Sequence, residues 1–257
     1  MPERIHPTAI VHALAELAPD VRIGPYAVIE GTVKIGRGSV IGPHVCILGR
    51  TTIGENNAIF PFAALGAEAQ LHKRGDEGPG VRELIIGDGN QIREHVTIHR
   101  GSLETPTRIG SKNLLMVGCH VAHDVQVGSS VTIANNVQIA GHAVIEDHVT
   151  FGGLAGVAQF VRIGQSAFIA AGAMVETNVP PFVIAQGDRA RVRALNRVGL
   201  ERRKIPAESV KALERAFRQI FRSGDVRAVA LSRIQSDDPC VRALVSFMRD
   251  PANPPTP

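Results

Sequence analysis

Large apolar residues recur at every sixth position over long stretches of this chain, and this period constrains the fold more than any other feature. The register holds for eleven positions from Ile5 to Leu65, for three positions from Ile86, and for twelve positions from Ile109 to Val175. A period of six fits neither the 3.6-residue turn of an α-helix nor the alternation of a simple β-strand. It is typical of a parallel β-helix, in which each hexad forms a short strand and a turn, and three hexads form one coil of eighteen residues.

The predicted core is aliphatic, because the chain has no Trp, one Tyr and nine Phe. A second set of mostly small residues stands four positions after members of the first set, and we expect these side chains to point inward as well. They are Ala27, Ser39, Val45, Thr51, Cys119, Val125, Ala143, Ala155 and Ala167.

Two breaks in the register and a proline pair indicate how the chain is divided. We expect a β-helix over residues 1–182, with loop excursions at residues 66–85 and 99–108 and an end at Pro180-Pro181. Long loops that interrupt a regular fold are usually functional or disordered. Residues 183–257 are expected to form a C-terminal α-helical domain.

Helix start signals divide this second domain. Pro206 can begin a helix whose apolar stripe includes Leu213, Phe217 and Ile220. Asp225 is expected to cap the next helix. The Asp238-Pro239 pair is expected to start the last one.

Cysteine content and the first residues suggest a reducing compartment. The three cysteines, Cys46, Cys119 and Cys240, form no paired framework. The chain starts without a signal-peptide pattern and has no run long enough to span a membrane. We therefore expect a cytoplasmic protein with no membrane insertion.

Positive charge is concentrated near the start of the helical domain. Residues 189–222 hold eleven Lys or Arg against three Glu, although the net charge of the chain is only +4. Such a face can attract nucleic acid, an anionic membrane, an acidic protein or a phosphorylated ligand, and it can also be a plain solvated helix face. Nucleic acid is the weakest of these options, because no nucleic-acid motif accompanies the charge.

Histidines gather in one part of the predicted β-helix. Residues eighteen apart stack on successive coils, about 4.8 Å apart like neighbouring strands. His123, Gly141 and Gln159 therefore form one column. Next to this column are expected His120 on the same turn, Asp124 directly after His123, and His142 directly after Gly141.

This cluster suits acyl transfer. A His can take a hydroxyl proton at neutral pH, an adjacent carboxylate can orient the imidazole, and a Gly N–H can face a developing oxyanion. An isolated His at a turn is more often an exposed polar residue, but three His and an Asp within 23 residues favour a site.

A second column, Asn135, Gly153 and Ala171, is nearly devoid of side chains. It could leave a groove for an alkyl chain, or it could reflect only the preference of turns for small residues.

Several stretches together are similar to a known family. IREHVTIHRG (92–101), NLLMVGCHVAHD (113–124), ANNVQIAGH (134–142), VPPFVIAQGD (179–188) and LNRVGLERRKIP (195–206) resemble the UDP-N-acetylglucosamine O-acyltransferases that begin lipid A synthesis. The resemblance spans nearly the whole chain. It implies a left-handed β-helix and a homotrimer with active sites between neighbouring subunits. The implied reaction transfers an (R)-3-hydroxyacyl group from acyl carrier protein, which brings its own phosphopantetheine, to the sugar 3-hydroxyl without a metal.

The resemblance also implies roles for individual residues. His123 matches the general base, Asp124 its orienting partner and Gly141 the backbone oxyanion donor. Ala171 matches the position that limits acyl-chain length. The implied substrate contacts are His120, His142 and Gln159, with Asn196, Arg202 and Arg203 near the nucleotide.

Three departures from the family pattern affect the acceptor more than the acyl transfer. Ala158 stands where a His is usual, Val198 stands where a Glu near the ribose is usual, and residues 66–85 lack the usual sugar-contacting run. A 3-amino UDP-sugar is therefore an alternative acceptor.

Other functions remain open at this point. The related N-acyltransferase normally has an additional N-terminal uridine-binding domain, for which hexads that begin at Ile5 leave no room. A hexapeptide zinc carbonic anhydrase would need three His ligands, and His95, His99, His120 and His123 match its spacing poorly. A solenoid scaffold without catalytic activity is the remaining alternative.

Overall fold

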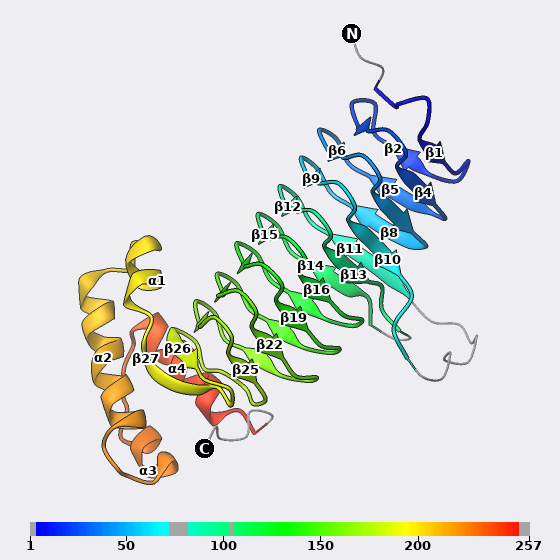
Figure 1. Cartoon of the computed structure of the whole chain (residues 1–257). Helices are drawn as coiled ribbons and strands as arrows, with labels where there is room; N and C mark the ends of the chain where they lie inside the picture. Colours follow the sequence, from blue (N-terminus) through cyan, green and yellow to red (C-terminus); the bar gives the residue numbers. More distant parts are fainter. Residues whose placement is uncertain (1–3, 72–81, 103–104, 252–257) are drawn as a thin grey trace.

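The computed structural model describes residues 4–71, 82–102 and 105–251. Residues 72–81 of the first predicted excursion and residues 103–104 of the second lie outside these ranges. Most of the described chain winds into a stack of coils with three sheets as its sides, and the helices lie at one end (Figure 1). The β-helix predicted from the hexad period is therefore confirmed.

Over the described residues the first sheet has nine strands, one from each successive coil. These are β1 (Ile10–Val11), β4 (Val28–Glu30), β7 (Cys46–Leu48), β10 (Ala64–Ala67), β13 (Thr97–His99), β16 (His120–Val121), β19 (Gln138–Ile139), β22 (Gly156–Val157) and β25 (Met174–Val175).

The second sheet has eight strands in the part of the chain that the structure describes. These are β2 (Glu16–Leu17), β5 (Val33–Ile35), β8 (Arg50–Ile53), β11 (Glu83–Ile86), β14 (Thr107–Ile109), β17 (Gln126–Val127), β20 (Val144–Ile145) and β23 (Arg162–Ile163).

The third sheet has ten strands among the described residues, and its last pair is antiparallel. They are β3 (Arg22–Ile23), β6 (Val40–Ile41), β9 (Ala58–Ile59), β12 (Gln91–Ile92), β15 (Leu114–Leu115), β18 (Thr132–Ile133), β21 (Thr150–Phe151), β24 (Phe168–Ile169), β26 (Val183–Gln186) and β27 (Arg191–Leu195). Strand β26 pairs with β24, so the third sheet continues past residue 182.

The interior of the β-helix is a continuous apolar core. From Ile23 to Val175 every sixth-position residue of the register is buried, and so is every one of the nine smaller residues predicted to point inward. Ile5, Val11 and Leu17 on the first coil are only partly buried, because this coil has a neighbour on one side only. Adjacent strands pair in register eighteen residues apart, as in Gln126 with Val144. Residues of one column therefore lie side by side.

Four helices within the described residues lie at the C-terminal end. They are α1 (Arg197–Arg202), α2 (Ala207–Phe221), α3 (Arg227–Ser232) and α4 (Pro239–Arg249). Pro206 precedes α2 and Asp238 caps α4 through the amides of Cys240 and Val241, as predicted. The prediction that Asp225 caps the third helix was wrong. Val226 holds the cap position and Asp225 instead pairs with Arg233 at 3.0 Å.

No helix within residues 4–71, 82–102 and 105–251 has both the length and the apolar character needed to cross a membrane.

Candidate active site

The corner between the first and second sheets brings the predicted histidines and their carboxylate together. Asp124, His142 and Phe160 occupy the same turn position on three successive coils, each with a left-handed φ of 60–64°. The His142 amide donates to the carbonyl of His123 at 3.1 Å, and the Phe160 amide donates to the carbonyl of Gly141 at 3.2 Å. The stacking inferred from the eighteen-residue period is therefore present. We refer to residues 123–124, 141–142 and 159–160 as the histidine corner.

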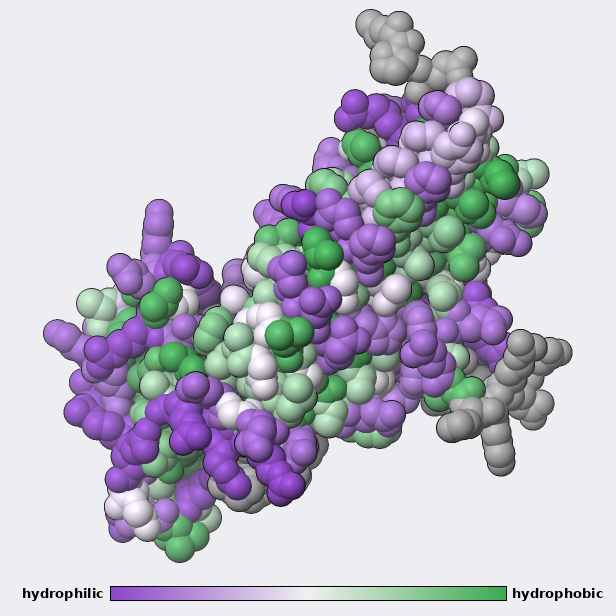
Figure 2. All heavy atoms as spheres, in the orientation of Figure 1, coloured by the Kyte–Doolittle hydropathy of each residue, from purple (hydrophilic) through white to green (hydrophobic). Residues whose placement is uncertain are grey.

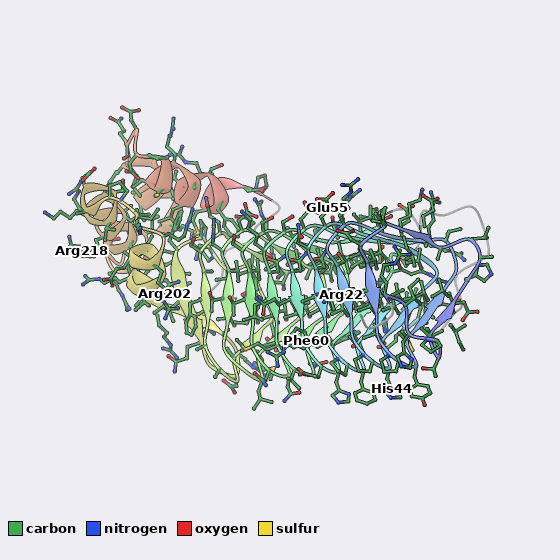
Figure 3. The ribbon with its side chains drawn as sticks, turned by 90° about the horizontal axis from the view of Figure 1, so that it is seen from above. Arg22, His44, Glu55, Phe60, Arg202 and Arg218 are labelled. Carbon is green, nitrogen blue, oxygen red and sulfur yellow. The ribbon has the colours of Figure 1, made fainter. Side chains whose placement is uncertain are left out.

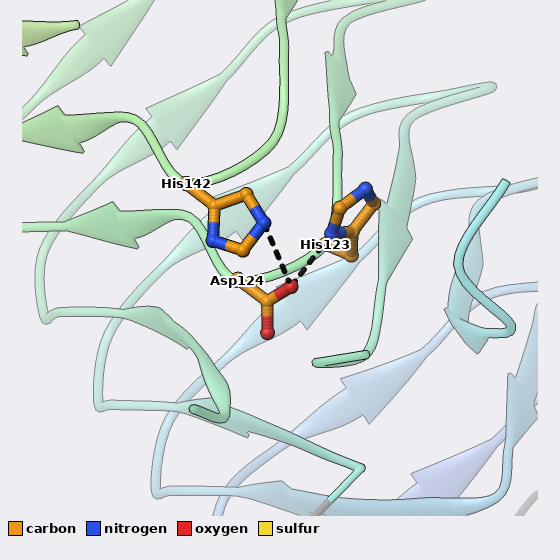
Figure 4. Close-up of side chains that lie close together, drawn as sticks. All are labelled: His123, Asp124 and His142. Atoms are coloured by element: carbon orange, nitrogen blue, oxygen red, sulfur yellow. Dashed lines mark hydrogen bonds and ion pairs between the residues drawn. The ribbon is translucent and has the colours of Figure 1, made fainter. Parts of the chain in front are cut away.

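Asp124 lies between two imidazoles (Figure 4). Its Oδ2 is 2.6 Å from Nδ1 of His123 and 3.6 Å from Nε2 of His142. His123 and Asp124 are buried, whereas the His142 side chain is 38% exposed. Because a carboxylate only accepts, Nδ1 of His123 donates this hydrogen bond, and the lone pair of a neutral ring is then on Nε2. His123 is thus in the tautomer that a general base requires.

The Asp124 carboxylate is held by the second excursion as well. The Ser102 amide donates to Oδ1 at 2.9 Å, and the Ser102 hydroxyl donates to Oδ2 at 2.6 Å. Burial acts to raise the pKa of Asp124, but the hydrogen bonds from Ser102 and His123 outweigh burial, and the pKa is lowered. Asp124 is therefore an anion at neutral pH. The sequence indicated Ser102 only through the break in register at residues 99–108.

Position 141 has no room for a side chain beside the His123 ring. A Cβ placed there would lie 2.8 Å from Cε1 and 3.0 Å from Nε2 of His123, closer than van der Waals contact allows. Among the described residues, the Gly141 amide has no hydrogen-bond acceptor. A free N–H beside the imidazole edge is the arrangement expected for an oxyanion donor.

The histidine corner borders a pocket of about 580 Å³. His120, His123, Gly141 and Gln159, four of the predicted site residues, line it. The His120 ring is fixed by a 2.8 Å hydrogen bond between its Nδ1 and Oγ1 of Thr97. Burial, followed by the nearby His123, lowers the pKa of His120, so this ring favours its neutral form.

His99 also lines the pocket and had no role in the predicted acyl-transfer site. It is 8% exposed, and within the described part of the chain its buried Nδ1 has no partner. Its ring stands edge-on to that of His120, with centroids 4.8 Å apart. Burial, with smaller contributions from His120 and His123, lowers the pKa of His99 to about 4.

Other lining residues were not predicted at all. They include Gln70, Gln138, Met174, Glu176 and Asp188. Thr97 and His120 are neighbours that a spacing of eighteen residues does not predict. The second excursion lengthens the coil between them, so the paired residues are 23 positions apart.

The small-residue column is present at a different corner, between the third and first sheets. The Leu154 amide donates to the carbonyl of Asn135 at 3.0 Å, and the Gly172 amide to that of Gly153 at 2.9 Å. Asn135, Gly153 and Ala171 do not line the pocket at the histidine corner.

The three residues expected near a nucleotide lie at the remaining corner, between the second and third sheets. Asn196 caps α1 by accepting from the Gly199 amide at 3.0 Å, and it donates to the Ser166 carbonyl at 2.9 Å. The guanidinium of Arg203 donates to the Ser166 hydroxyl. Arg202 is exposed at the helical end (Figure 3). Within one chain these residues do not join the pocket.

The described residues contain one group able to hold a metal ion, formed by His123, Asp124 and His142. This is not the three-histidine set that a carbonic anhydrase needs. His95 lies elsewhere, in an outward stack where its ring centroid is 5.1 Å from that of Phe62. Nδ1 of His123 is also already occupied by Asp124.

Known proteins share this fold and sequence along nearly the full length. Residues 178–254 match the model of UDP-N-acetylglucosamine O-acyltransferase domain 2, and residues 4–49 and 106–141 match the bacterial transferase hexapeptide repeat. The acyl-carrier-protein–UDP-N-acetylglucosamine O-acyltransferases of Myxococcus xanthus and Halorhodospira halophila are 48% and 46% identical. The matches cover 91% and 95% of this chain and 90% and 96% of those proteins.

A solved structure agrees. The UDP-N-acetylglucosamine O-acyltransferase of Moraxella catarrhalis superimposes with a TM-score of 0.90 at 39% identity, over 96% of each chain. The chain therefore belongs to the acyl-carrier-protein–UDP-N-acetylglucosamine O-acyltransferase family.

Proposed function

We propose that this protein transfers an (R)-3-hydroxyacyl group from acyl carrier protein to the 3-hydroxyl of UDP-N-acetylglucosamine, the first step of lipid A biosynthesis. The observation that carries the proposal is the buried His123–Asp124 pair at the edge of an open pocket, with the Gly141 amide beside it. The relatives are named for O-acylation, which favours a sugar hydroxyl over the 3-amino alternative.

The reaction follows from the two ends of the His123 imidazole. Nε2 takes the proton of the sugar hydroxyl as its oxygen attacks the thioester carbonyl. The negative charge of Asp124 stabilises the imidazolium that forms, and the Gly141 N–H donates to the oxyanion of the tetrahedral intermediate. When the C–S bond breaks, the phosphopantetheine thiolate leaves and takes the proton from His123. The products are the ester and free carrier thiol.

A metal has no role in this proposal. The thioester is already an activated acyl donor, and His123 supplies the base. The phosphopantetheine arrives on the carrier protein, so the enzyme needs no cofactor of its own.

We assign the acyl chain to the column of Asn135, Gly153 and Ala171. This column borders the first sheet, whose strands also present His120 and Gln138 to the pocket. An alkyl chain that starts at the histidine corner can cross the first sheet toward the column. Ala171, with one methyl more than glycine, would then limit chain length.

We propose a homotrimer as the working form. The histidine corner and the Arg202–Arg203 corner lie on different edges of one chain, so a nucleotide sugar can contact both only if a neighbouring copy supplies one of them. Large apolar side chains are exposed along the first sheet and at both corners that border it: Phe160 at 69% in the histidine corner, Met174 at 44% on the sheet, and Leu154 at 65% at the corner of the small-residue column. Such a cluster is typical of a surface that another chain covers.

Acyl carrier protein is the proposed partner of the basic helical end. Figure 2 shows hydrophilic side chains gathered over the helices, and Arg218 projects there in Figure 3. A hollow of about 370 Å³ between β27 and α2 is lined by Arg193, Arg197, Arg218 and Arg222. Arg197 is paired with Glu214 at 2.8 Å. An acidic carrier protein would be steered to this surface, and salt would weaken the steering. Both this partner and the nucleotide sugar fit a cytoplasmic enzyme.

The proposal is tested by product analysis. Purified protein is incubated with 3-hydroxyacyl carrier proteins of several chain lengths and UDP-N-acetylglucosamine, and the products are identified by mass spectrometry and NMR. A single acyl group on the sugar 3-oxygen is expected, and a 3-deoxy acceptor should give no product. Acylation at another position, or equal reaction of the 3-deoxy sugar, would refute the assigned acceptor atom.

A further inference from the structure

The second excursion interrupts the six-residue period and returns to a single carboxylate. Ser102 donates twice to Asp124, through its amide to Oδ1 at 2.9 Å and through its hydroxyl to Oδ2 at 2.6 Å. These two bonds come from a residue 22 positions earlier in the chain. The repeat itself contributes neither of them.

The far end of the same excursion fixes the backbone of Asp124. Oγ1 of Thr107 accepts from the Asp124 amide at 2.8 Å. The Gln126 side chain donates to the carbonyl of Pro106 at 2.7 Å and to that of Asp124 at 3.3 Å. Both ends of the loop therefore hold Asp124.

We propose that Ser102 is a positioning residue for the reaction, which fixes the Asp124 carboxylate against Nδ1 of His123. This inference rests on the function proposed above. The terminal torsion of an aspartate is broad, so a carboxylate held only by its histidine could turn. The amide and hydroxyl of Ser102 engage both oxygens at once and set the plane of the carboxylate. Oδ2 then faces the imidazole at 2.6 Å.

The shared oxygen also matters for the proton. Oδ2 accepts hydrogen bonds from both the Ser102 hydroxyl and Nδ1 of His123, so its negative charge is shared between two donors. An oxygen with two donors is a weaker base than one with a single donor. The proton at Nδ1 therefore stays on the imidazole, and the proton gained at Nε2 is the one released to the leaving thiolate.

A matched pair of variants isolates the hydroxyl. Ser102→Thr keeps it, whereas Ser102→Val has nearly the same shape without it, and both keep the backbone amide. The initial rate of acyl transfer is measured at varied concentrations of each substrate. Loss of a hydrogen bond to a charged group predicts that kcat of Ser102→Val is about 10- to 100-fold below that of Ser102→Thr. The KM values should stay within about twofold of each other, because Ser102 does not line the pocket.

A double variant tests whether Ser102 acts through Asp124. In an Asp124→Asn background, Ser102→Val should lower kcat by less than about twofold relative to Ser102→Thr. Equal kcat values for the Thr and Val variants of the otherwise unchanged protein would overturn the proposal. So would a Val effect that persists in full in the Asn background. Thermal unfolding of each variant identifies any that fail to fold.

A readout without turnover separates this inference from the proposed function. The carboxyl of Asp124 is titrated by carbon NMR, with its signal assigned by comparison with Asp124→Asn. Without the hydroxyl, the pKa of Asp124 should be higher in Ser102→Val than in Ser102→Thr. If the parent protein makes no acylated sugar, the proposed function fails, and equal pKa values in the two variants would independently sink the role of Ser102.

Discussion

Replacing Gly141 with alanine perturbs the histidine corner by a single methyl group. The added Cβ would lie 2.8 Å from Cε1, 3.0 Å from Nε2 and 3.3 Å from Nδ1 of His123. Contacts below about 3.4 Å between carbon atoms are repulsive. Asp124 holds the imidazole through the 2.6 Å hydrogen bond between Nδ1 of His123 and Oδ2 of Asp124. The ring must therefore move by several tenths of an ångström and stretch this hydrogen bond.

The size of the effect follows from this displacement. A misplacement of about 1 Å at a reacting group costs about a hundredfold in rate. A shift of about half that distance, with a weaker hold on the imidazole, predicts a fall in kcat of about 10- to 100-fold. Added bulk in a packed site also destabilises by about 1–3 kcal/mol. The variant should therefore fold, with a lower melting temperature.

The control is Gly156→Ala, which faces the same pocket. Its Cβ would also lie 2.8 Å from its nearest neighbour, but that neighbour is the flexible Met174 thioether, which can turn aside. Initial rates of acylated-sugar formation are compared for both variants and the parent protein. If Gly141→Ala keeps the parent kcat, or if Gly156→Ala loses as much, the imidazole is not positioned as described.

Three further predictions concern other parts of the site. The pKa of His99 is about 4 when folded against an ordinary 6.5, so the neutral ring stabilises the fold above pH 6.5 and this contribution is lost as the pH falls toward 4. This contribution amounts to up to about 3 kcal/mol. The free energy of unfolding, measured in urea at several pH values, should depend less on pH in His99→Gln than in the parent protein. Parallel curves for the two proteins would contradict this prediction. Ala171→Gly should shift the preference toward longer acyl chains, and an unchanged preference among carrier proteins of different chain length would argue against the groove. Arg202→Ala and Arg203→Ala should raise the KM for the nucleotide sugar and leave kcat nearly unchanged. An unaltered affinity for the nucleotide sugar would refute this prediction.

The hexad period was sufficient to predict the coils and the contacts within them. His123, Gly141 and Gln159 lie on successive coils, as the eighteen-residue step requires. The reason is physical, because each strand pairs in register with the strand one coil away. Residues eighteen positions apart are therefore neighbours in space.

The same rule fails where the chain leaves the coil. Ser102 lies 22 residues from Asp124, and no period predicts which loop atom returns to a carboxylate. Thr97 meets His120 across a step of 23 residues for the same reason. Residues that follow an excursion keep their inward pattern, but their partners one coil back depend on the length of the loop.

The helical end was predictable where a cap or a proline marks it. Asp238 caps α4 as expected, because its side chain can reach the amides of Cys240 and Val241. Asp225 was misassigned, since one residue separates it from the helix and its carboxylate pairs with Arg233 instead. The short helix α1 had no apolar period to indicate it, and only Leu200 among its residues is buried.

In the proposed reaction His123 removes the hydroxyl proton, and the turnover rate of His123→Ala tests this role. His95→Ala is the matched control, because His95 stacks in an outward ladder away from the pocket. General-base removal predicts that kcat for acylation of UDP-N-acetylglucosamine falls by about 10²- to 10⁴-fold in His123→Ala. His95→Ala should stay close to the parent rate. A folded His123→Ala protein that turns over at the parent rate would rule out His123 as the general base.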